Sequence, residues 1–232
     1  MRKPQCFCFP CAGGAATFFQ GIEKDLPDAE LVKMEYAGHG TRRKEPFYRD
    51  FGELAEDMVS RLRSAYTGGT YALFGYSMGS IALAEVLKRI LADPGFPVPC
   101  CAFLGAHAPG PKAELEGFRP DELDEWVRER TIRFGAIPER IQRNASFWRM
   151  YLPLYRADYT IIGKYEFDKL DLRTDVPAAV FYSETDTPRR EMEAWRKYFT
   201  GECGYYAYPG SHFFILEHHA EMAEIIREKM GL

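Results

Sequence analysis

Long apolar runs are missing from this sequence. No stretch approaches the roughly 20 apolar residues that a membrane-spanning helix needs, so we expect no membrane insertion. The charged segment and apolar core of a secretory signal are missing too, because residues 1–5 lead straight into a strand-length run at residues 6–9. The sequence therefore predicts a protein that acts in the cytoplasm.

An excess of positive charge is also lacking. The 232 residues include 30 lysines and arginines against 34 aspartates and glutamates, which gives a net charge of -4 at pH 7. A protein that binds nucleic acid generally presents a basic stripe to the phosphate backbone. We therefore expect no nucleic-acid partner.

Metal-binding and nucleotide-binding patterns are absent as well. Of the six cysteines, Cys6, Cys8 and Cys11 lie close together, but no second pair follows at the spacing of a zinc site. We interpret the cysteines as small, reduced core residues. The turn at residues 11–16 lacks both the Gly-Lys-Ser/Thr ending of a phosphate loop and the glycine spacing of a dinucleotide site. The sequence predicts no metal and no organic cofactor.

What the sequence does contain is an alternation of short apolar runs and helical patterns. Hydrophobic residues make up 46% of the chain and charged residues 28%, and the length suits one domain over residues 1–232. The alternation predicts an α/β fold with a mainly parallel sheet flanked by helices. We expect strands at residues 5–10, 30–36, 70–76, 99–107, 176–183 and 203–208, and helices at 17–25, 50–66, 81–91 and 219–230, with one more helix ending at Phe199.

The chain is organised around a Gly-x-Ser-x-Gly motif at residues 75–79. A β-type run leads into the motif, and an apolar helical run follows it. The nucleophile of an α/β-hydrolase occupies a sharp, strained turn between strand and helix, where small neighbours are needed. Such a motif often arises by chance, but this one lies at the junction that the mechanism requires. We therefore predict Ser77 as the nucleophile.

An acid and a base follow Ser77 in the order typical of an α/β-hydrolase. Asp186 comes just after the strand expected at 176–183, and His212 just after the strand expected at 203–208. Ligands bind at this end of the strands in open α/β sheets. His212 can take the serine proton near neutral pH, and Asp186 can orient the imidazole. We predict these three residues as a catalytic triad.

Both partners of the serine have rivals. Glu184 lies close to Asp186, but Asp186 lies deeper in the same turn. Asp171 and Asp175 precede their strand and so belong to the wrong end of the sheet. The other histidines precede the nucleophile, end a strand far from the expected base position or begin the last helix: His39, His107, His218 and His219.

Backbone N–H groups are expected to stabilise the oxyanion that forms during acyl transfer. In α/β-hydrolases one N–H comes from the residue after the nucleophile, and another from a loop after an early strand. Here these would be the N–H of Met78 and an N–H from the Cys11/Ala12 region, with Ala12 as the donor.

The pattern changes between residues 110 and 163. Amphipathic helices rich in aromatic residues are expected at 122–134, 138–144 and 147–162. A helical insertion in an otherwise alternating chain is typical of a cap over an active site. We interpret residues 110–163 as a helical lid, although apolar faces of this kind also serve in ordinary packing.

Together these motifs resemble the type II thioesterases, the free-standing editing enzymes that accompany nonribosomal peptide and polyketide synthases. The resemblance spans nearly the full chain. Two departures are Ala37, where a proline is common, and the lack of a glycine before the acid. The matching segments are residues 7–14, Gly38-His39-Gly40 with Arg42, Glu45 and Pro46, residues 74–79, Ala108-Pro109, residues 154–159 with their Arg-Ala-Asp, Asp186 with Trp195, and residues 210–214.

The resemblance implies hydrolysis of acyl thioesters on the phosphopantetheine arm of an acyl- or peptidyl-carrier protein, which removes stalled or mis-primed acyl groups. It also implies that small acyl thioesters are substrates and that no cofactor takes part. The same triad would serve an acyl-CoA thioesterase or a general carboxylesterase. A hydrolase fold kept as a non-catalytic binding module is a further alternative.

A docking site for the carrier would need a local basic patch. Carrier proteins are usually acidic, and this chain is itself acidic, so only local charge complementarity could guide docking. The candidates are Arg42, Arg43 and Lys44, or Arg149 and Arg156.

Overall fold

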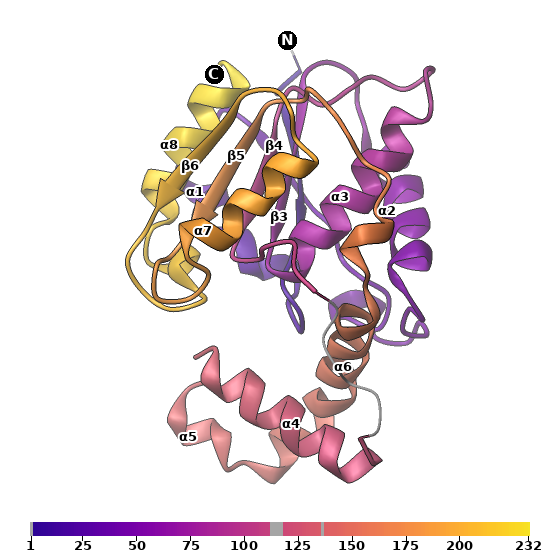
Figure 1. Ribbon diagram of the computed structural model, residues 1–232, viewed down its shortest axis with the longest axis vertical. Coiled ribbons are helices and arrows are strands. Elements are labelled where there is room, and N and C mark those ends of the chain that lie inside the picture. The colour runs from indigo at the N-terminus through magenta and orange to yellow at the C-terminus, as the bar shows by residue number, and fades with distance from the viewer. Residues whose placement is uncertain (1, 112–117, 136) are drawn as a thin grey trace.

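The structure is a computed structural model that describes residues 2–111, 118–135 and 137–232 (Figure 1). Its strands are β1 Gln5–Phe9, β2 Glu30–Lys33, β3 Tyr71–Tyr76, β4 Ala102–Gly105, β5 Ala178–Tyr182 and β6 Cys203–Ala207. They form one six-stranded sheet in the order β2-β1-β3-β4-β5-β6, and every neighbouring pair is parallel. The predicted α/β class with a mainly parallel sheet is confirmed.

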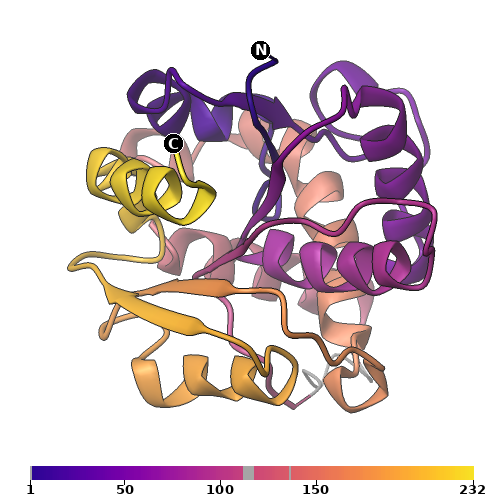
Figure 2. The ribbon, with the colours of Figure 1, turned by 90° about the horizontal axis from the view of Figure 1, so that it is seen from above.

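Helices pack on both faces of this sheet. They are α1 Gln20–Asp25, α2 Phe51–Ala65, α3 Met78–Leu91, α7 Arg189–Met192 and α8 His219–Met230. Because successive strand residues point to opposite faces, Phe7 and Phe9 join the apolar core with α2 and α3, whereas Cys6 and Cys8 join the core with α1 and α8. Figure 2 shows the α1/α8 pair and the α2/α3 pair on opposite sides of the sheet.

The helix after the Gly-x-Ser-x-Gly motif is the most buried of these. Eleven residues of α3 are buried, since the helix contacts α2 on one side and β1, β3 and β4 on the other. This explains its apolar sequence on nearly every face. The helix begins at Met78, earlier than the expected start at residue 81, so its first turn follows Ser77 directly.

Several expected elements are shorter or tighter than predicted. The helix expected at 17–25 opens with a 3-10 turn at Ala16–Phe19, and α7 continues as a 3-10 segment at Glu193–Lys197. The second strand ends at Lys33, and the chain then turns so that the Tyr36 hydroxyl donates to the Pro10 carbonyl at 3.0 Å. These differences leave the positions of the predicted site residues unchanged.

Three helices fill the connection between β4 and β5. They are α4 Pro120–Arg133, α5 Glu139–Gln142 and α6 Ala145–Lys164, and we call them the α4–α6 segment. They enclose an apolar cluster of their own around Val127, Trp148 and Tyr159. Figure 1 shows α4 and α5 beyond one end of the sheet, with α6 leading back toward it. Of the segment predicted at 110–163, residues 112–117 and 136 lie outside the described residues.

Candidate active site

Ser77 occupies the sharp turn between β3 and α3. Its backbone is at φ 54° and ψ -120°, a conformation that residues with a side chain rarely adopt. A Cβ on Gly75 would lie 2.2 Å from the Gly79 carbonyl oxygen, and one on Gly79 would lie 1.9 Å from the Phe9 carbonyl oxygen. The two glycines are therefore required because three backbone segments touch at this point.

Backbone and hydroxyl groups hold this turn in place. The Ser77 N–H donates to the Gly105 carbonyl at 2.7 Å. The Ser80 hydroxyl lies 3.0 Å from the Gly75 and Gly105 carbonyl oxygens and accepts from the Gly105 N–H at 3.2 Å. Ser80 thus connects the turn to the neighbouring strand β4. No local sequence pattern indicates this role, because Gly105 and Ser80 are brought together only by strand pairing.

The structure brings the three predicted triad residues together. His212 Nε2 lies 2.8 Å from Ser77 Oγ, and His212 Nδ1 lies 2.8 Å from Asp186 Oδ2. The side chains of His212 and Asp186 are only 6% and 11% exposed. In this arrangement Nδ1 donates to the carboxylate, and Nε2 can accept the serine proton. These distances would allow Ser77 to act as a nucleophile with His212 as base and Asp186 as orienting acid, and those roles stay predictions.

The loops that carry Asp186 and His212 are cross-linked by hydroxyl groups. Ser183 Oγ and Thr185 Oγ1 donate to the Gly210 carbonyl at 2.7 and 2.8 Å. Two further hydroxyls bond to the predicted triad residues, since Thr187 Oγ1 donates to Asp186 Oδ2 at 3.0 Å and the buried Tyr76 hydroxyl donates to the His212 carbonyl at 2.8 Å. These contacts hold the turn that carries Asp186 beside the loop that carries His212, although the glycine that often precedes the acid is lacking.

The rival residues lie in other surroundings. Burial and the neighbouring His212 and Arg130 lower the pKa of His107 to about 4, so this ring is neutral at pH 7. His219 lies 2.5 Å from Asp25, and His218 lies 3.6 Å from Glu221. Glu184 is exposed. In the described part of the chain, the ring nitrogen within hydrogen-bond distance of Ser77 belongs to His212.

The predicted oxyanion donors lie on either side of the same junction. Met78 is the first residue of α3, so its N–H has no acceptor within the helix. Ala12 lies in the loop after β1, which reaches α3 because the end of β1 packs against Gly79. The next residue of this loop, Gly13, donates its N–H to Asp158 Oδ2 on α6 at 2.7 Å. The roles of Met78 and Ala12 stay predictions.

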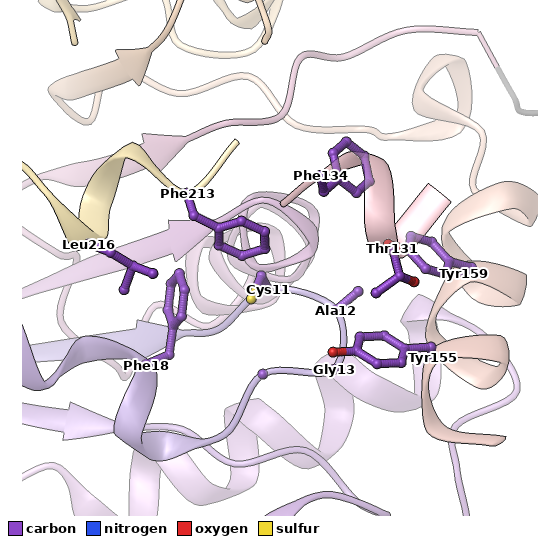
Figure 3. Close-up of a pocket in the computed structure, with 11 residues that line it drawn as sticks. Cys11, Ala12, Gly13, Phe18, Thr131, Phe134, Tyr155, Tyr159, Phe213 and Leu216 are labelled. Carbon is purple, nitrogen blue, oxygen red and sulfur yellow. The ribbon is translucent and has the colours of Figure 1, made fainter. Parts of the chain in front are cut away.

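A cavity of about 210 Å³ adjoins the predicted triad (Figure 3). Phe134, after the last turn of α4, stacks on His212 with ring centroids 4.2 Å apart. Ser77 is not among the described residues that line the cavity. Figure 3 shows Phe18, Phe213 and Leu216 on one side of the loop after β1, with the side chains of α4 and α6 on the other. Five of the eleven described lining residues are aromatic: Cys11, Ala12, Gly13, Gly14, Phe18, Thr131, Phe134, Tyr155, Tyr159, Phe213 and Leu216.

The basic residues predicted to dock a carrier protein differ in their exposure and in their ion pairs. Arg42 is buried and bonded to Glu45 and Asp57, and its pKa is raised because those hydrogen bonds outweigh the opposing effect of burial. The prediction that Arg42 is available to bind a carrier protein is therefore wrong. Arg156 pairs with Asp124 at 3.2 Å. The remaining three candidates, Arg43, Lys44 and Arg149, are exposed.

Neither a cluster of metal ligands nor a membrane-spanning helix is found in the described ranges. Among residues 2–111, 118–135 and 137–232, no three or more His, Cys, Asp or Glu side chains gather where they could hold a metal ion. None of the helices in this part of the chain is both long and apolar enough to cross a membrane.

Known proteins share both the sequence pattern and the fold. The thioesterase domain family matches residues 4–230. A medium-chain S-acyl fatty acid synthase thioesterase from Rattus norvegicus is 31% identical over 90% of this chain and 81% of its own length. The gramicidin S biosynthesis protein GrsT from Aneurinibacillus migulanus is 28% identical over 99% of this chain and 90% of its own.

A solved structure also shares the fold of this chain. ClbQ, from the colibactin NRPS/PKS pathway, superposes with a TM-score of 0.87 at 25% identity, covering 99% of this chain and 98% of that one.

Proposed function

This chain belongs to the thioesterase family and is an enzyme that hydrolyses thioesters, and we propose that it does so with Ser77, His212 and Asp186, on acyl groups attached to the phosphopantetheine arm of a carrier protein. The observation that supports this best is the 2.8 Å separation of His212 Nε2 and Ser77 Oγ beside an aromatic cavity. We further propose that the reaction takes place in the cytoplasm.

The proposed chemistry proceeds through an acyl-enzyme. His212 Nε2 takes the Ser77 proton as Oγ attacks the thioester carbonyl carbon, and Asp186 stabilises the imidazolium that results. The N–H groups of Met78 and Ala12 stabilise the oxyanion, a contribution of about 3 kcal/mol per donor in comparable enzymes. The C–S bond then breaks, and His212 returns its proton to the leaving thiolate.

Water completes the cycle. It enters as the thiol leaves, and His212 removes one of its protons while the oxygen attacks the acyl-enzyme carbonyl. Collapse of the second tetrahedral intermediate breaks the ester bond and returns the proton to Ser77 Oγ. The products are a carboxylic acid and a free carrier thiol, and no cofactor is consumed.

The cavity suits an acyl group rather than a whole carrier arm. Its volume of about 210 Å³ is below the roughly 300–1,000 Å³ of pockets that hold drug-sized ligands. Five of its eleven described lining residues are aromatic, so a short apolar acyl chain would bury apolar surface against them. We propose that short acyl thioesters are the substrates, including free small thioesters.

We also propose that the α4–α6 segment is a lid. Its residues Thr131, Phe134, Tyr155 and Tyr159 form one wall of the cavity. Phe134 covers one face of the His212 ring, so this segment shields the base from solvent. The alternative, in which these helices serve only in ordinary packing, does not account for the contact between Phe134 and His212.

The names of the relatives support a carrier-bound substrate. One relative is a fatty acid synthase thioesterase by name, and the gramicidin S protein and ClbQ are named for biosynthetic pathways. We propose an editing role, in which stalled or mis-primed acyl groups are removed. An acyl-CoA thioesterase or a carboxylesterase would use the same three residues, whereas the complete hydrogen-bonded triad speaks against a non-catalytic binding module.

Acyl release from a carrier protein tests this proposal. Acetyl- and propionyl-phosphopantetheinyl carrier protein would be incubated with the enzyme and followed by intact-protein mass spectrometry. The matching acyl-CoA and oxygen ester, and Ser77→Ala, would be assayed alongside. We expect Ser77-dependent release that is faster from the carrier than from CoA or the ester. Preference for CoA or the ester would overturn the carrier assignment, and release by Ser77→Ala would overturn the mechanism.

A further inference from the structure

A buried ion pair connects the loop after β2 with helix α6. His39 Nε2 lies 2.9 Å from Asp158 Oδ2, and the two side chains are 2% and 4% exposed. His39 Nδ1 lies 3.0 Å from the Ala37 carbonyl oxygen. Both ring nitrogens therefore face oxygen acceptors, and a neutral imidazole can donate from only one of them. The surroundings of His39 thus favour the doubly protonated, charged ring.

The same carboxylate oxygen also holds the loop after β1. Asp158 Oδ2 accepts the Gly13 N–H at 2.7 Å, so one atom joins three segments that are far apart in the sequence. Gly13 has φ +69°, and a Cβ there would lie 2.0 Å from the ring of Tyr155. Tyr155 and Asp158 are three residues apart on α6 and so lie on the same face of the helix. On this face of α6, the Tyr155 ring packs against Gly13 and the Asp158 carboxylate accepts the Gly13 N–H.

The position of Gly13 makes this contact important for the chemistry. The Gly13 N–H belongs to the peptide group that directly follows Ala12, whose own N–H we propose as an oxyanion donor. Holding the Gly13 peptide in one orientation therefore also restricts the orientation of the Ala12 N–H. The loop's own hydrogen bond runs from the Gly14 N–H to the Cys11 carbonyl at 2.9 Å, and it leaves the Gly13 N–H for Asp158. The orientation of the loop thus depends on α6.

We propose that Asp158 is a positioning residue that holds the Cys11–Gly14 loop so that the Ala12 N–H points at the developing oxyanion, and that His39 holds Asp158 charged and in place. The inference rests on the proposed mechanism at Ser77. A buried ion pair is by itself a weak source of stability, so its presence beside the catalytic loop calls for another role. The oxyanion site then forms only when α6 is packed against the loop after β1.

Substitutions at Asp158 test the role. Asp158→Leu removes the acceptor but keeps a side chain branched at Cγ, and Asp158→Asn keeps an oxygen but loses the charge. Asp124→Asn is the matched control, because it removes the negative charge of the Asp124–Arg156 pair between α4 and α6 without touching the loop. Each variant would be assayed on the N-acetylcysteamine thioester of propionate, with propylboronic acid as an inhibitor that forms a tetrahedral adduct with serine.

We expect a loss that is confined to the transition state. Asp158→Leu should lower kcat about 100-fold, the effect of losing one oxyanion donor, with KM changed less than about threefold. The affinity for propylboronic acid should fall by a similar factor. Asp158→Asn should lose about 10-fold in both, since a neutral amide binds the Gly13 N–H more weakly. Asp124→Asn should stay within about twofold of the parent enzyme.

Specific outcomes would overturn the proposal. One is a folded Asp158→Leu variant with parent-like kcat, and another is a fall in kcat with unchanged affinity for the boronic acid. Should Asp158→Leu fail to fold, Asp158→Asn decides in the same way, by whether kcat and boronic acid affinity fall together. Failure of the underlying mechanism is recognised separately, because Ser77→Ala would then still hydrolyse the thioester.

Discussion

On the sheet side of the candidate site, backbone atoms of β1, β3 and α3 pack directly against one another, whereas on the side of the α4–α6 segment aromatic and charged side chains make the contacts. Glycines at 75 and 79 leave no room for a Cβ. Across the cavity, Phe134, Tyr155 and Asp158 reach the site from helices with a small core of their own. The difference suggests two tasks under the proposed mechanism: the sheet side holds Ser77, and the helical side shapes the cavity and holds the loop after β1 through Asp158.

The largest effect should come from the sheet side, on activity. His212→Ala removes the base beside Ser77, and we expect kcat/KM for a small acyl thioester to fall at least about 10⁴-fold. His219→Ala is the matched control, because His219 pairs with Asp25 on the α1/α8 side. Steady-state hydrolysis measures both. A His212→Ala variant within tenfold of the parent would contradict the assignment.

The next effect should be on folding. In Gly79→Ala the new Cβ would meet the Phe9 carbonyl oxygen, and neither backbone segment can move aside cheaply. We expect the free energy of unfolding to drop by about 3 kcal/mol or more, together with activity. Gly110→Ala provides the comparison, since the nearest atom to its Cβ would be 3.9 Å away. Denaturant unfolding measures both, and equal stabilities would show that the turn is less tightly packed than described.

A smaller and different effect is expected from the helical side. Phe134→Ala removes a cavity wall and the ring stacked on His212, so room for longer acyl chains increases. We expect the ratio of kcat/KM for octanoyl over propionyl thioesters to rise about tenfold. Phe147→Ala, in the same segment but stacked on Tyr151 outside the cavity, should leave the ratio unchanged. Equal behaviour of the two variants would rule out a specificity role for Phe134.

The smallest effect concerns the pH dependence of stability. Burial lowers the pKa of His39, but the charge and hydrogen bond of Asp158, with smaller effects from Ala37 and Glu35, raise it above its ordinary value of 6.5. Protonation of His39 therefore stabilises the fold fully below about pH 6.5, and this stabilisation is lost as pH rises through the raised pKa.

Thermal unfolding between about pH 6 and pH 9 would reveal this contribution. The Tm of the parent should fall relative to that of His39→Gln as the pH rises, because the variant has no imidazolium to lose. Parallel curves for the two proteins would show that His39 is neutral in the fold.

The sequence located the three helices of the α4–α6 segment within two residues of their ends, but it did not indicate their side-chain contacts with the site. Ser77 lies in a local motif, and the order of Asp186 and His212 after successive strands follows from how parallel sheets are built. All six cysteines were expected in the core; Cys6, Cys8, Cys11 and Cys101 are buried, whereas Cys100 and Cys203 are only half-buried.

Other features depend on contacts between distant segments and left no local pattern. Ser80 bonds to the neighbouring strand, Tyr76 reaches the His212 carbonyl, and Ser183 reaches Gly210. The resemblance pointed to the Arg-Ala-Asp segment but gave no role for Asp158, because its partners Gly13 and His39 lie more than a hundred residues away in the chain.

The way in which the α4–α6 segment joins the sheet bears on how a new substrate range could be engineered. The segment enters and leaves through a single connection, between β4 and β5. A replacement module grafted there would leave the strand order and the Ser77 turn unaltered. If the proposed role of Asp158 holds, the new module would have to supply one carboxylate at that position, since the Gly13 N–H of the loop after β1 donates to it.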